Sequence, residues 1–537
     1  MEASTRFEGD FRDLAFLKAL LPDTALRRRV AIPALIRLRG SAGADRGTFS
    51  TASTLSADGG ELSVKGRFNP REQSYDAAIR ADSFPLNSFL PADSLGIVDL
   101  ALQARGTGFD PLLPRTRTSL RAQIGRAEFG GRDFGGIELD AELDSQRLSG
   151  RISDRDEALR LLLSVSGTLT EREQRIGLSG SVFGFDLAAL GVSPEPIGGS
   201  FALDASASAA GKGAYAARIA LDSIEIRNKH RTDRIRPTSV SLHTDSAATR
   251  AEAASGDLSL TFSTPQSADS LIAALTRSAR TLAGQIDAQS IDMEQLKPAL
   301  PDFALRVSAG PDNILNSLLK SRKIAFDALN AEGANCDSLP VSIRLRTEGL
   351  AYGNVVLDTV TADIRQNGKR LEYALGLANA PENLDNIARA GLYGHLVRNT
   401  GQANLYQRNR AGREGFRFGL DVTWTDSLVR ASVTPPDPLF GFEPWTVNRG
   451  NYLAYRFDKR VEADLDMTHG DQRFAIRTTP GGGDDDDIRL DIAGLNVGPA
   501  LELFPSAPPV DGVLGANLTL NLAADSLSLR GGVSVAE

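Results

Sequence analysis

The residue types that most often carry chemistry are few in this chain and lie far apart. Its four histidines, His230, His243, His395 and His469, stand singly, and none has metal-ligand spacing with another histidine or with Cys336, the one cysteine. The sequence also contains no glycine-rich phosphate loop, nucleophile elbow or paired-carboxylate signature. It therefore predicts a protein that is not an enzyme and that uses no metal or other cofactor.

Three further motifs have a chemical interpretation that their surroundings disfavour. The run Asp484 to Asp487 lacks the spaced ligands of a calcium loop and fits a solvated hairpin tip better. The glycosylation sequon at Asn517 falls inside a predicted strand. Phe442 and Trp445 belong to a Pro-rich aromatic island, and we expect them to pack a loop against a sheet, with a gate or docking site as the alternative.

Charge and cysteine content limit the possible partners and say little about the compartment. The net charge is −8, which argues against nucleic acid as a partner because nucleic-acid binders usually carry a basic patch. The one small basic cluster, Arg27 to Arg29, is interpreted as a solvated edge. A single cysteine cannot form an internal disulfide, and the sequence contains neither a long apolar run nor a signal start.

Apolar and polar residues alternate with a period of two through most of the chain. Residues 47–68, for example, alternate on both sides of an Asp58-Gly59 turn, which is a strong hairpin signal. Aromatic residues make up only 6% of the chain, too few for the core of a typical two-sheet sandwich. The sequence therefore predicts an all-β fold, an elongated repetitive antiparallel sheet curled into an open half-pipe, or β-taco, with an apolar groove.

Helices are expected to be few, short and amphipathic. The sequence predicts them near residues 11–21, 267–282 and 311–322. In the second, Leu271, Ile272, Leu275, Ala279 and Leu282 fall on one helical face, after a cap at Ser267 or Asp269. Such helices suit either shielding of a sheet face or simple connection of strands.

A longer repeat is also visible. Four passages end one strand, make a helical or looping step and start another, at Leu86, Leu187, Met293 and Val497. The intervals between them are 101, 106 and 204 residues, the last about twice the others. We interpret these passages as degenerate copies of one unit, against the alternative of a chance likeness between β-rich segments.

The apolar positions of the alternating strands are the candidate binding residues. A single sheet that curls would line a groove with them, and burial of alkyl chains at about 0.8 kcal/mol per CH₂ needs no polar anchor. The residues therefore predict a ligand with alkyl chains, and the family resemblance given below implies that these are phospholipid acyl chains. The predicted lining comprises Leu62, Val64, Phe68, Leu100, Leu102, Leu139, Leu143, Leu161, Leu163, Val165, Leu178, Leu518, Leu520 and Leu529.

The segment from Asn383 to the C-terminal end resembles the TamB translocation-and-assembly family, in its Bacteroidota-like form. The resemblance lies in ENLDNIARAGLYGHL, in residues 412–457, in VEADLDMTHGDQRFAI and in DIRLDIAGLNVGPALELFPSAPPVDGVLGANLTL. Residues 1–380 fit the family by strand pattern only. This divides the chain into a repetitive β-groove segment, 1–380, and a TamB-like segment, 381–537, truncated at its C-terminal end.

The resemblance implies a setting and partners that the residues alone do not. It implies a periplasmic lipid conduit in a Gram-negative envelope, similar to AsmA-like and bridge-like lipid transfer proteins, which supports outer-membrane protein assembly. An inner-membrane anchor before the chain and an Omp85-type outer-membrane barrel reached by a following C-terminal region would be its partners. Both ends of this chain are expected to be boundaries within a longer protein.

A structural protein, either a β-solenoid or a scaffold for outer-membrane assembly without lipid transport, is the alternative function. A solenoid would show a strict short repeat with stacked identical residues, which the sequence lacks. An enzyme acting on envelope glycans is disfavoured because catalytic residue types do not cluster.

Overall fold

The computed structural model describes residues 2–12, 30–90, 95–211, 213–229, 231–320, 322–336, 338–380, 382–383, 387–458, 460–479, 487–504, 507, 510–523 and 526–536. Strand accounts for 67% of the structure and helix for 9%, which confirms the predicted all-β class. The chain forms two compact units, residues 1–246 and 247–537, called unit 1 and unit 2 below.

Unit 1 is one antiparallel sheet. Its described strands are β1 (Glu2–Arg12), β2 (Leu35–Asp45), β3 (Thr48–Ala57), β4 (Gly60–Asn69), β5 (Ser74–Pro85), β6 (Leu95–Thr107), β7 (Arg117–Phe129), β8 (Arg132–Phe134), β9 (Ile137–Asp144), β10 (Arg147–Arg155), β11 (Leu159–Leu169), β12 (Glu173–Asp186), β13 (Gly198–Ala210), β14 (Ala214–Arg227), β15 (Thr232–Ile235) and β16 (Thr238–Thr244). Its one described helix is α2 (Leu86–Phe89).

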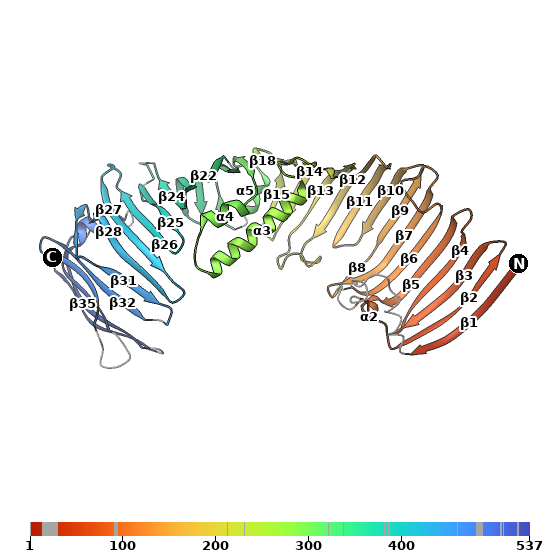
Figure 1. Ribbon diagram of the computed structural model, residues 1–537, viewed down its shortest axis with the longest axis horizontal. Helices are drawn as coiled ribbons and strands as arrows, with labels where there is room; N and C mark the ends of the chain where they lie inside the picture. The colour runs from red at the N-terminus through yellow and green to blue at the C-terminus, as the bar shows by residue number, and fades with distance from the viewer. Residues whose placement is uncertain are drawn as a thin grey trace. The chain divides into compact units, whose positions relative to one another are not determined.

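Strands of unit 1 pair with their neighbours in the sequence. From β1 to β7, and again from β9 to β14, each strand pairs with the next, so that strands β1 to β7 lie side by side in Figure 1. The short β8 and the longer β9 both pair with β7, and β15 and β16 both pair with β14. Within the described residues β1 pairs with β2 alone, so the sheet is not closed into a barrel.

Two-residue turns explain why neighbouring strands become hairpins. Between β3 and β4, Asp58 and Gly59 have φ of 45° and 88°, and Ala57 pairs with Gly60. Positive φ at both central positions is the type I′ geometry, which matches the twist of the flanking strands. The hairpin predicted at Asp58-Gly59 is therefore confirmed.

Unit 2 is also an antiparallel sheet, with more helices. Its described strands are β17 (Thr249–Ser255), β18 (Leu258–Thr264), β19 (Phe303–Ala309), β20 (Ile324–Ala325), β21 (Ala328–Cys336), β22 (Leu339–Tyr352), β23 (Val355–Asn367), β24 (Arg370–Ala378), β25 (Arg389–Val397), β26 (Thr400–Arg408), β27 (Glu414–Trp424), β28 (Leu428–Phe440), β29 (Glu443–Pro444), β30 (Thr446–Val447), β31 (Tyr452–Arg456), β32 (Val461–His469), β33 (Gln472–Thr479), β34 (Asp487–Asn496), β35 (Val513–Ala523) and β36 (Ser526–Ala536). Its described helices are α3 (Ala268–Asp287), α4 (Met293–Ala299), α5 (Ile314–Lys320) and α6 (Val497–Leu501).

The main ladder of unit 2 runs through β17, β18, β19, β21 to β28, and β31 to β36. Three short strands are added at its margins, β20 on β22, β29 on β28 and β30 on β32. Within the described residues β36 pairs with β35 alone, so this sheet is not closed either.

The predicted helices are confirmed at two of their three places. Helix α3 begins after the predicted Ser267 cap, whose hydroxyl accepts a hydrogen bond from the Ser270 amide at 3.3 Å. Helix α5 occupies the middle of the 311–322 prediction. The helix predicted near 11–21 lies outside the described residues, except that positions 11 and 12 end strand β1.

Helix α3 does not bury the face that its sequence suggests. Ser278 Oγ donates to the Ala299 carbonyl at 2.7 Å and Gln285 Nε2 donates to the Asp292 carbonyl at 2.9 Å. These bonds hold the small and polar side of α3 against the α4 segment. The apolar side, which includes Ile272 and Leu282, is consequently exposed.

The predicted repeat corresponds to a recurring local structure. Helices α2, α4 and α6 begin at Leu86, Met293 and Val497, and a turn begins at Leu187. Three of these four steps follow an irregularity in the preceding strand, between Ala81 and Phe84, Val182 and Phe185, or Ile492 and Leu495. A bulge bends the strand that carries it, which directs the chain out of the ladder before the next strand begins.

Candidate functional site

The apolar residues of unit 1 form continuous rows across the sheet. Side chains directly opposite each other in an antiparallel ladder point to the same face. The register therefore places one row through ten strands, with a single glycine in it: Val64, Ile79, Leu102, Ala122, Leu139, Ile152, Leu163, Gly180, Leu203 and Leu221. We call the face that carries this row the apolar face of unit 1.

All eleven predicted lining residues of unit 1 lie on this apolar face. Four belong to the row just given, and the others belong to parallel rows two or four positions away along their strands: Leu62, Phe68, Leu100, Leu143, Leu161, Val165 and Leu178. Residues separated by two positions share a face of the pleat, so the rows adjoin. The structure thus brings these residues together on one surface.

The two faces of unit 1 differ in exposure as well as in polarity. Leu163 on the apolar face is 7% exposed, whereas its neighbour Leu162 on the opposite face is 37% exposed. All described strands of unit 1 belong to the one sheet, and its one described helix, α2, is four residues long. Among the described residues, therefore, no second layer covers the apolar face, and most of its side chains are only half-buried.

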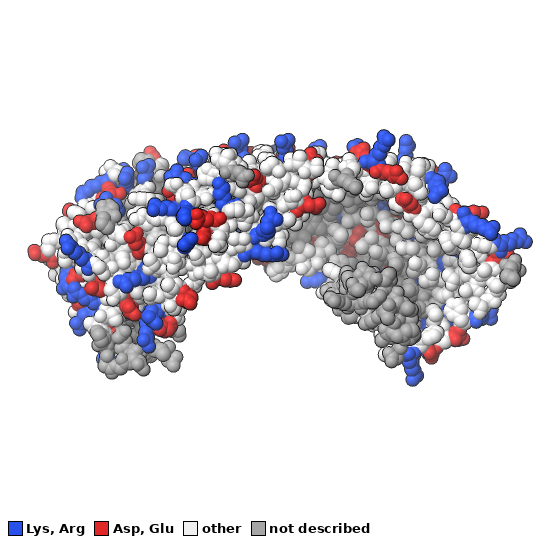
Figure 2. All heavy atoms as spheres, in the orientation of Figure 1, with Lys and Arg blue, Asp and Glu red and all other residues white. Residues whose placement is uncertain are grey.

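The opposite face of unit 1 carries a ladder of ion pairs. Arg105 and Asp76 approach to 2.9 Å and Arg121 and Asp140 to 2.7 Å, each pair joining adjacent strands. Exposed pairs of this kind contribute little to stability, but they keep the face hydrated and each arginine neutralised. Figure 2 shows basic and acidic side chains interspersed along the margins of the surface in view.

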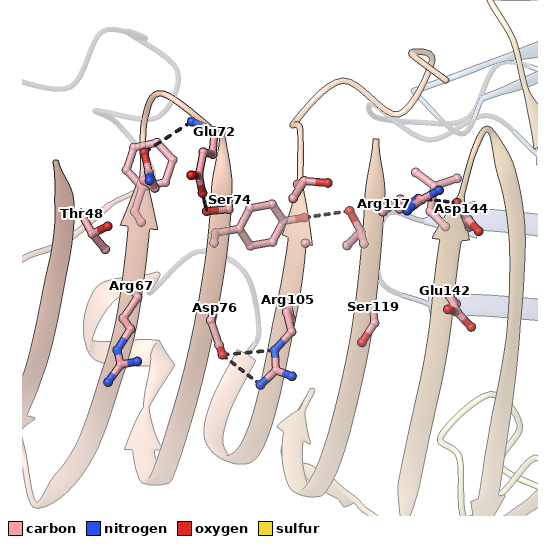
Figure 3. Close-up of a pocket in the computed structure, with 17 residues that line it drawn as sticks. Thr48, Arg67, Glu72, Ser74, Asp76, Arg105, Arg117, Ser119, Glu142 and Asp144 are labelled. Atoms are coloured by element: carbon pink, nitrogen blue, oxygen red, sulfur yellow. Dashed lines mark hydrogen bonds and ion pairs between the residues drawn. The ribbon is translucent and has the colours of Figure 1, made fainter. Parts of the chain in front are cut away.

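A depression of about 730 Å³ lies over the ends of strands β3 to β7 and of β9 (Figure 3). Its charged side chains are largely paired, Arg105 with Asp76 and Arg117 with Asp144 at 2.9 Å. Because carboxylates already occupy these arginines, the depression offers no strong site for an anionic ligand. Its lining also includes Phe68 and Leu143 of the apolar face, so the depression lies at the strand ends where the two faces meet, and we do not interpret it as a separate anion site.

In unit 2 the three remaining predicted residues also share one face. Leu518 belongs to a row with Leu490, Ile476 and Leu465, and Leu520 lies opposite Leu529 on the last strand. Leu529 is mostly exposed because β36 has no further described strand beside it. We call the face that carries this row the apolar face of unit 2.

Part of the apolar face of unit 2 is covered by the chain itself. Trp445 is 2% exposed and forms a core with Leu465 and Met467, against which Phe418, Val433, Phe440, Val447, Leu453, Phe474 and Leu495 pack. Strand β31 lies between β28 and β32 but is shorter than either. Beyond its end, the segment that carries Trp445 takes its place, because β29 pairs with β28 and β30 pairs with β32. The expectation that Phe442 and Trp445 pack a loop against the sheet is therefore confirmed.

The sheet of unit 2 curls around this core. Strands β26 and β34 are six steps apart in the ladder, about 29 Å if the sheet were flat. Yet Gln407 Nε2, near the end of β26, donates a hydrogen bond to the carbonyl of Leu503, seven residues after the end of β34. Five of those seven residues form α6 and advance about 1.5 Å each, so the connection is too short for a flat sheet.

The residues considered for metal or redox chemistry are dispersed. His469 Nδ1 lies 2.8 Å from the Pro444 carbonyl, in the packing around Trp445, whereas His243 and His395 lie in separate strands. His230 and most of the Asp484 to Asp487 run lie outside the described residues. Nowhere in the described ranges do three or more His, Cys, Asp or Glu side chains group as a metal site.

Two buried or half-buried carboxylates have perturbed acidity. The bidentate hydrogen bonds from Arg473 to Asp466, at 2.6 and 2.9 Å, lower the pKa of Asp466. Burial raises the pKa of Asp154, although its carboxylate accepts a hydrogen bond from the Asp156 amide at 2.9 Å. Both groups support local structure, Asp466 between strands β32 and β33 and Asp154 at the end of β10.

Comparison of the chain with protein-family models, curated proteins and solved structures finds no match. The fold and the site define it as an all-β protein whose sheets separate an aliphatic face from a charged face. In the part that the structure describes, no helix is long and apolar enough to cross a membrane.

Proposed function

We propose that the protein is a phospholipid conduit, whose apolar sheet faces hold acyl chains and let them move across the sheet from one strand to the next. The observation that carries this proposal is the row of aliphatic side chains across ten strands of unit 1, over which the described residues place no second layer. An uncovered apolar surface of this extent is unstable in water, and an acyl chain is the ligand that it suits best.

The chemistry of the rows supports sliding rather than capture at one point. Leu, Ile, Val, Ala and Gly supply the whole row, so a methylene group meets nearly the same surroundings at each strand. The opposite face is charged and hydrated, so acyl chains bind to the apolar face alone. The open half-pipe form of the sheet, with an apolar groove, is part of this proposal.

The cellular setting rests on the resemblance to the TamB family. We propose a periplasmic location between an inner-membrane anchor and an Omp85-type barrel in the outer membrane, and a supporting role in outer-membrane protein assembly. Nothing about the charge distribution opposes this setting.

A structural scaffold without transported lipid is the second candidate function. The specific observation in its favour is the Trp445 core, since a sheet face that the chain covers for itself needs no ligand. The two candidates differ in what unit 1 carries after purification.

Lipid extraction and site-specific photo-crosslinking test the proposal. Chain purified from a Gram-negative host should release phospholipid to mass spectrometry, and crosslinkers at Leu139 and Leu178 should label it. The matched positions Asp140 and Ser179, next in sequence and on the charged face, should not. Equal labelling of both faces, or a chain free of lipid with all positions unlabelled, would favour the scaffold.

A further inference from the structure

The chain covers the apolar face of unit 2 most densely at Trp445. This residue projects onto the face that carries Leu465 and Met467, which the register connects to Leu490 and Leu518. Leu465 is 4% exposed and Met467 is 5% exposed, so little solvent reaches this part of the apolar face. Here the interior is filled with side chains to the degree expected of a protein core.

Several directional contacts fix the covering segment in place. The Trp445 amide donates to the Pro438 carbonyl at 2.8 Å, and its indole Nε1 donates to the Phe440 carbonyl at 3.2 Å. The Phe442 amide donates to the Gly415 carbonyl at 3.1 Å, and the Arg413 guanidinium lies 4.5 Å from the Phe442 ring centroid. Because its backbone amide and its indole N–H both donate hydrogen bonds, Trp445 is held in one orientation and is not a loosely packed side chain.

A second segment closes the rim beside the Trp445 core. Leu503, which follows α6, is buried against Gly415 and Phe442 and leaves no room for a side chain at Gly415. Ala500 of α6 packs next to Gly441, whose φ of 60° lets the chain turn there. Segments from β28 to β30 and from α6 therefore meet over the same few strands.

The same face is far more open elsewhere in unit 2. The row that reaches Phe418 passes through Leu405, Leu392 and Leu375, and Leu375 is 44% exposed. Filled and open parts of one face thus lie within a single unit, with Leu375 on β24 and Leu465 on β32 six steps apart in the ladder.

We infer that Trp445, with Leu465, Met467, Phe440 and Phe474 packed around it, is a stopper that excludes acyl chains from the apolar face between β27 and β33. This inference rests on the proposed function and sets a boundary to it: lipid on strands such as β24 and β25 does not continue across β27 to β33.

Quenching of tryptophan fluorescence by brominated lipid tests the stopper without disturbing it. Trp424→Phe leaves Trp445 as the single reporter in the stopper. A second protein, with Trp424→Phe, Trp445→Phe and Leu375→Trp, carries the reporter on the open part of the same face. Each is loaded with dioleoyl phosphatidylglycerol or with its dibrominated form, whose bromine atoms lie in the acyl chains.

We expect bromine to quench the Leu375→Trp reporter at least threefold more than Trp445. Equal quenching of the two reporters would overturn the stopper while leaving lipid binding by the face intact. No quenching of either reporter would refute lipid binding itself and the stopper with it. Circular dichroism of both proteins verifies that the substitutions leave the sheet formed.

Discussion

A single carboxylate on the apolar face should interrupt lipid binding. The matched pair is Val165→Asp and Ser164→Asp, which add the same group at adjacent positions of β11 on opposite faces. Val165 lies between Gly150 and Leu178, whereas Ser164 lies opposite Arg151, which can pair with an aspartate. The two variants therefore differ in which face receives the charge and not in the charge itself.

The size of the effect follows from the geometry of the row. One acyl chain extends about 15 Å, half the hydrocarbon thickness of a bilayer, and so spans about three strand spacings of 4.8 Å. A chain that avoids the carboxylate loses contact with about three methylene groups, at about 0.8 kcal/mol each. The loss of about 2.4 kcal/mol corresponds to roughly 50-fold weaker binding, since 1.4 kcal/mol is tenfold.

The assay is the amount of phospholipid retained per protein, measured by extraction and mass spectrometry, together with the rate of lipid transfer between donor and acceptor vesicles. Val165→Asp should lose lipid and transfer, and Ser164→Asp should stay within about twofold of the wild type, because exposed charges have small effects. Each strand contacts mainly its neighbours, so the fold should survive both changes. A folded Val165→Asp protein that carries as much lipid as Ser164→Asp would refute the reasoning.

Two further predictions concern the perturbed carboxylates. Asp466→Asn should lower the free energy of unfolding by about 1.5–3 kcal/mol at pH 7, the range for hydrogen bonds to charged groups. Because the pKa of Asp466 is lowered in the folded state, the wild type should hold this extra stability above about pH 4 and lose it as the pH falls through the folded pKa. Urea unfolding of both proteins over this pH range measures the difference. The pH dependence that Asp154 contributes has the opposite sign, because burial raises its pKa in the folded state. Its contribution to stability is full below about pH 4 and is lost as the pH rises. Asp154→Asn keeps the acceptor for the Asp156 amide and should therefore gain stability relative to the wild type as the pH rises from about 3 to about 7.

Local patterns in the sequence predict the strands and their faces well. Alternation assigns Val64, Leu102, Leu139 and Leu163 to one side of their strands, and the register confirms that these sides coincide. This works because a strand has a side-chain period of two and short turns fix the pairing of each hairpin.

Features that depend on contacts between strands far apart in the ladder cannot be predicted from local sequence patterns. Alternation cannot show that Leu503 reaches Gln407, because that contact depends on how strongly the ladder between them curls. The orientation of α3 is likewise decided by hydrogen bonds from Ser278 and Gln285 to the α4 segment, which compete with its apolar stripe. Sequence alone gives the stripe but not the partner that the helix packs against.

The neighbour-to-neighbour pairing of unit 1 makes its width adjustable in steps of one hairpin. Strand β9 ends and strand β12 begins at the same rim, because the hairpin of β10 and β11 leaves that rim and returns to it. The register places Leu139 and Gly180 in the same row across the strands, with β10 and β11 between them. Loss of the hairpin would therefore bring them directly opposite each other with every apolar row intact. Deletion or duplication of a hairpin therefore changes the sheet by about 9.6 Å without turning a single side chain to the other face. Gain or loss of whole hairpins can in this way change the extent of such a sheet, whereas loss of one strand alone would send the chain to the wrong end of the neighbouring strand.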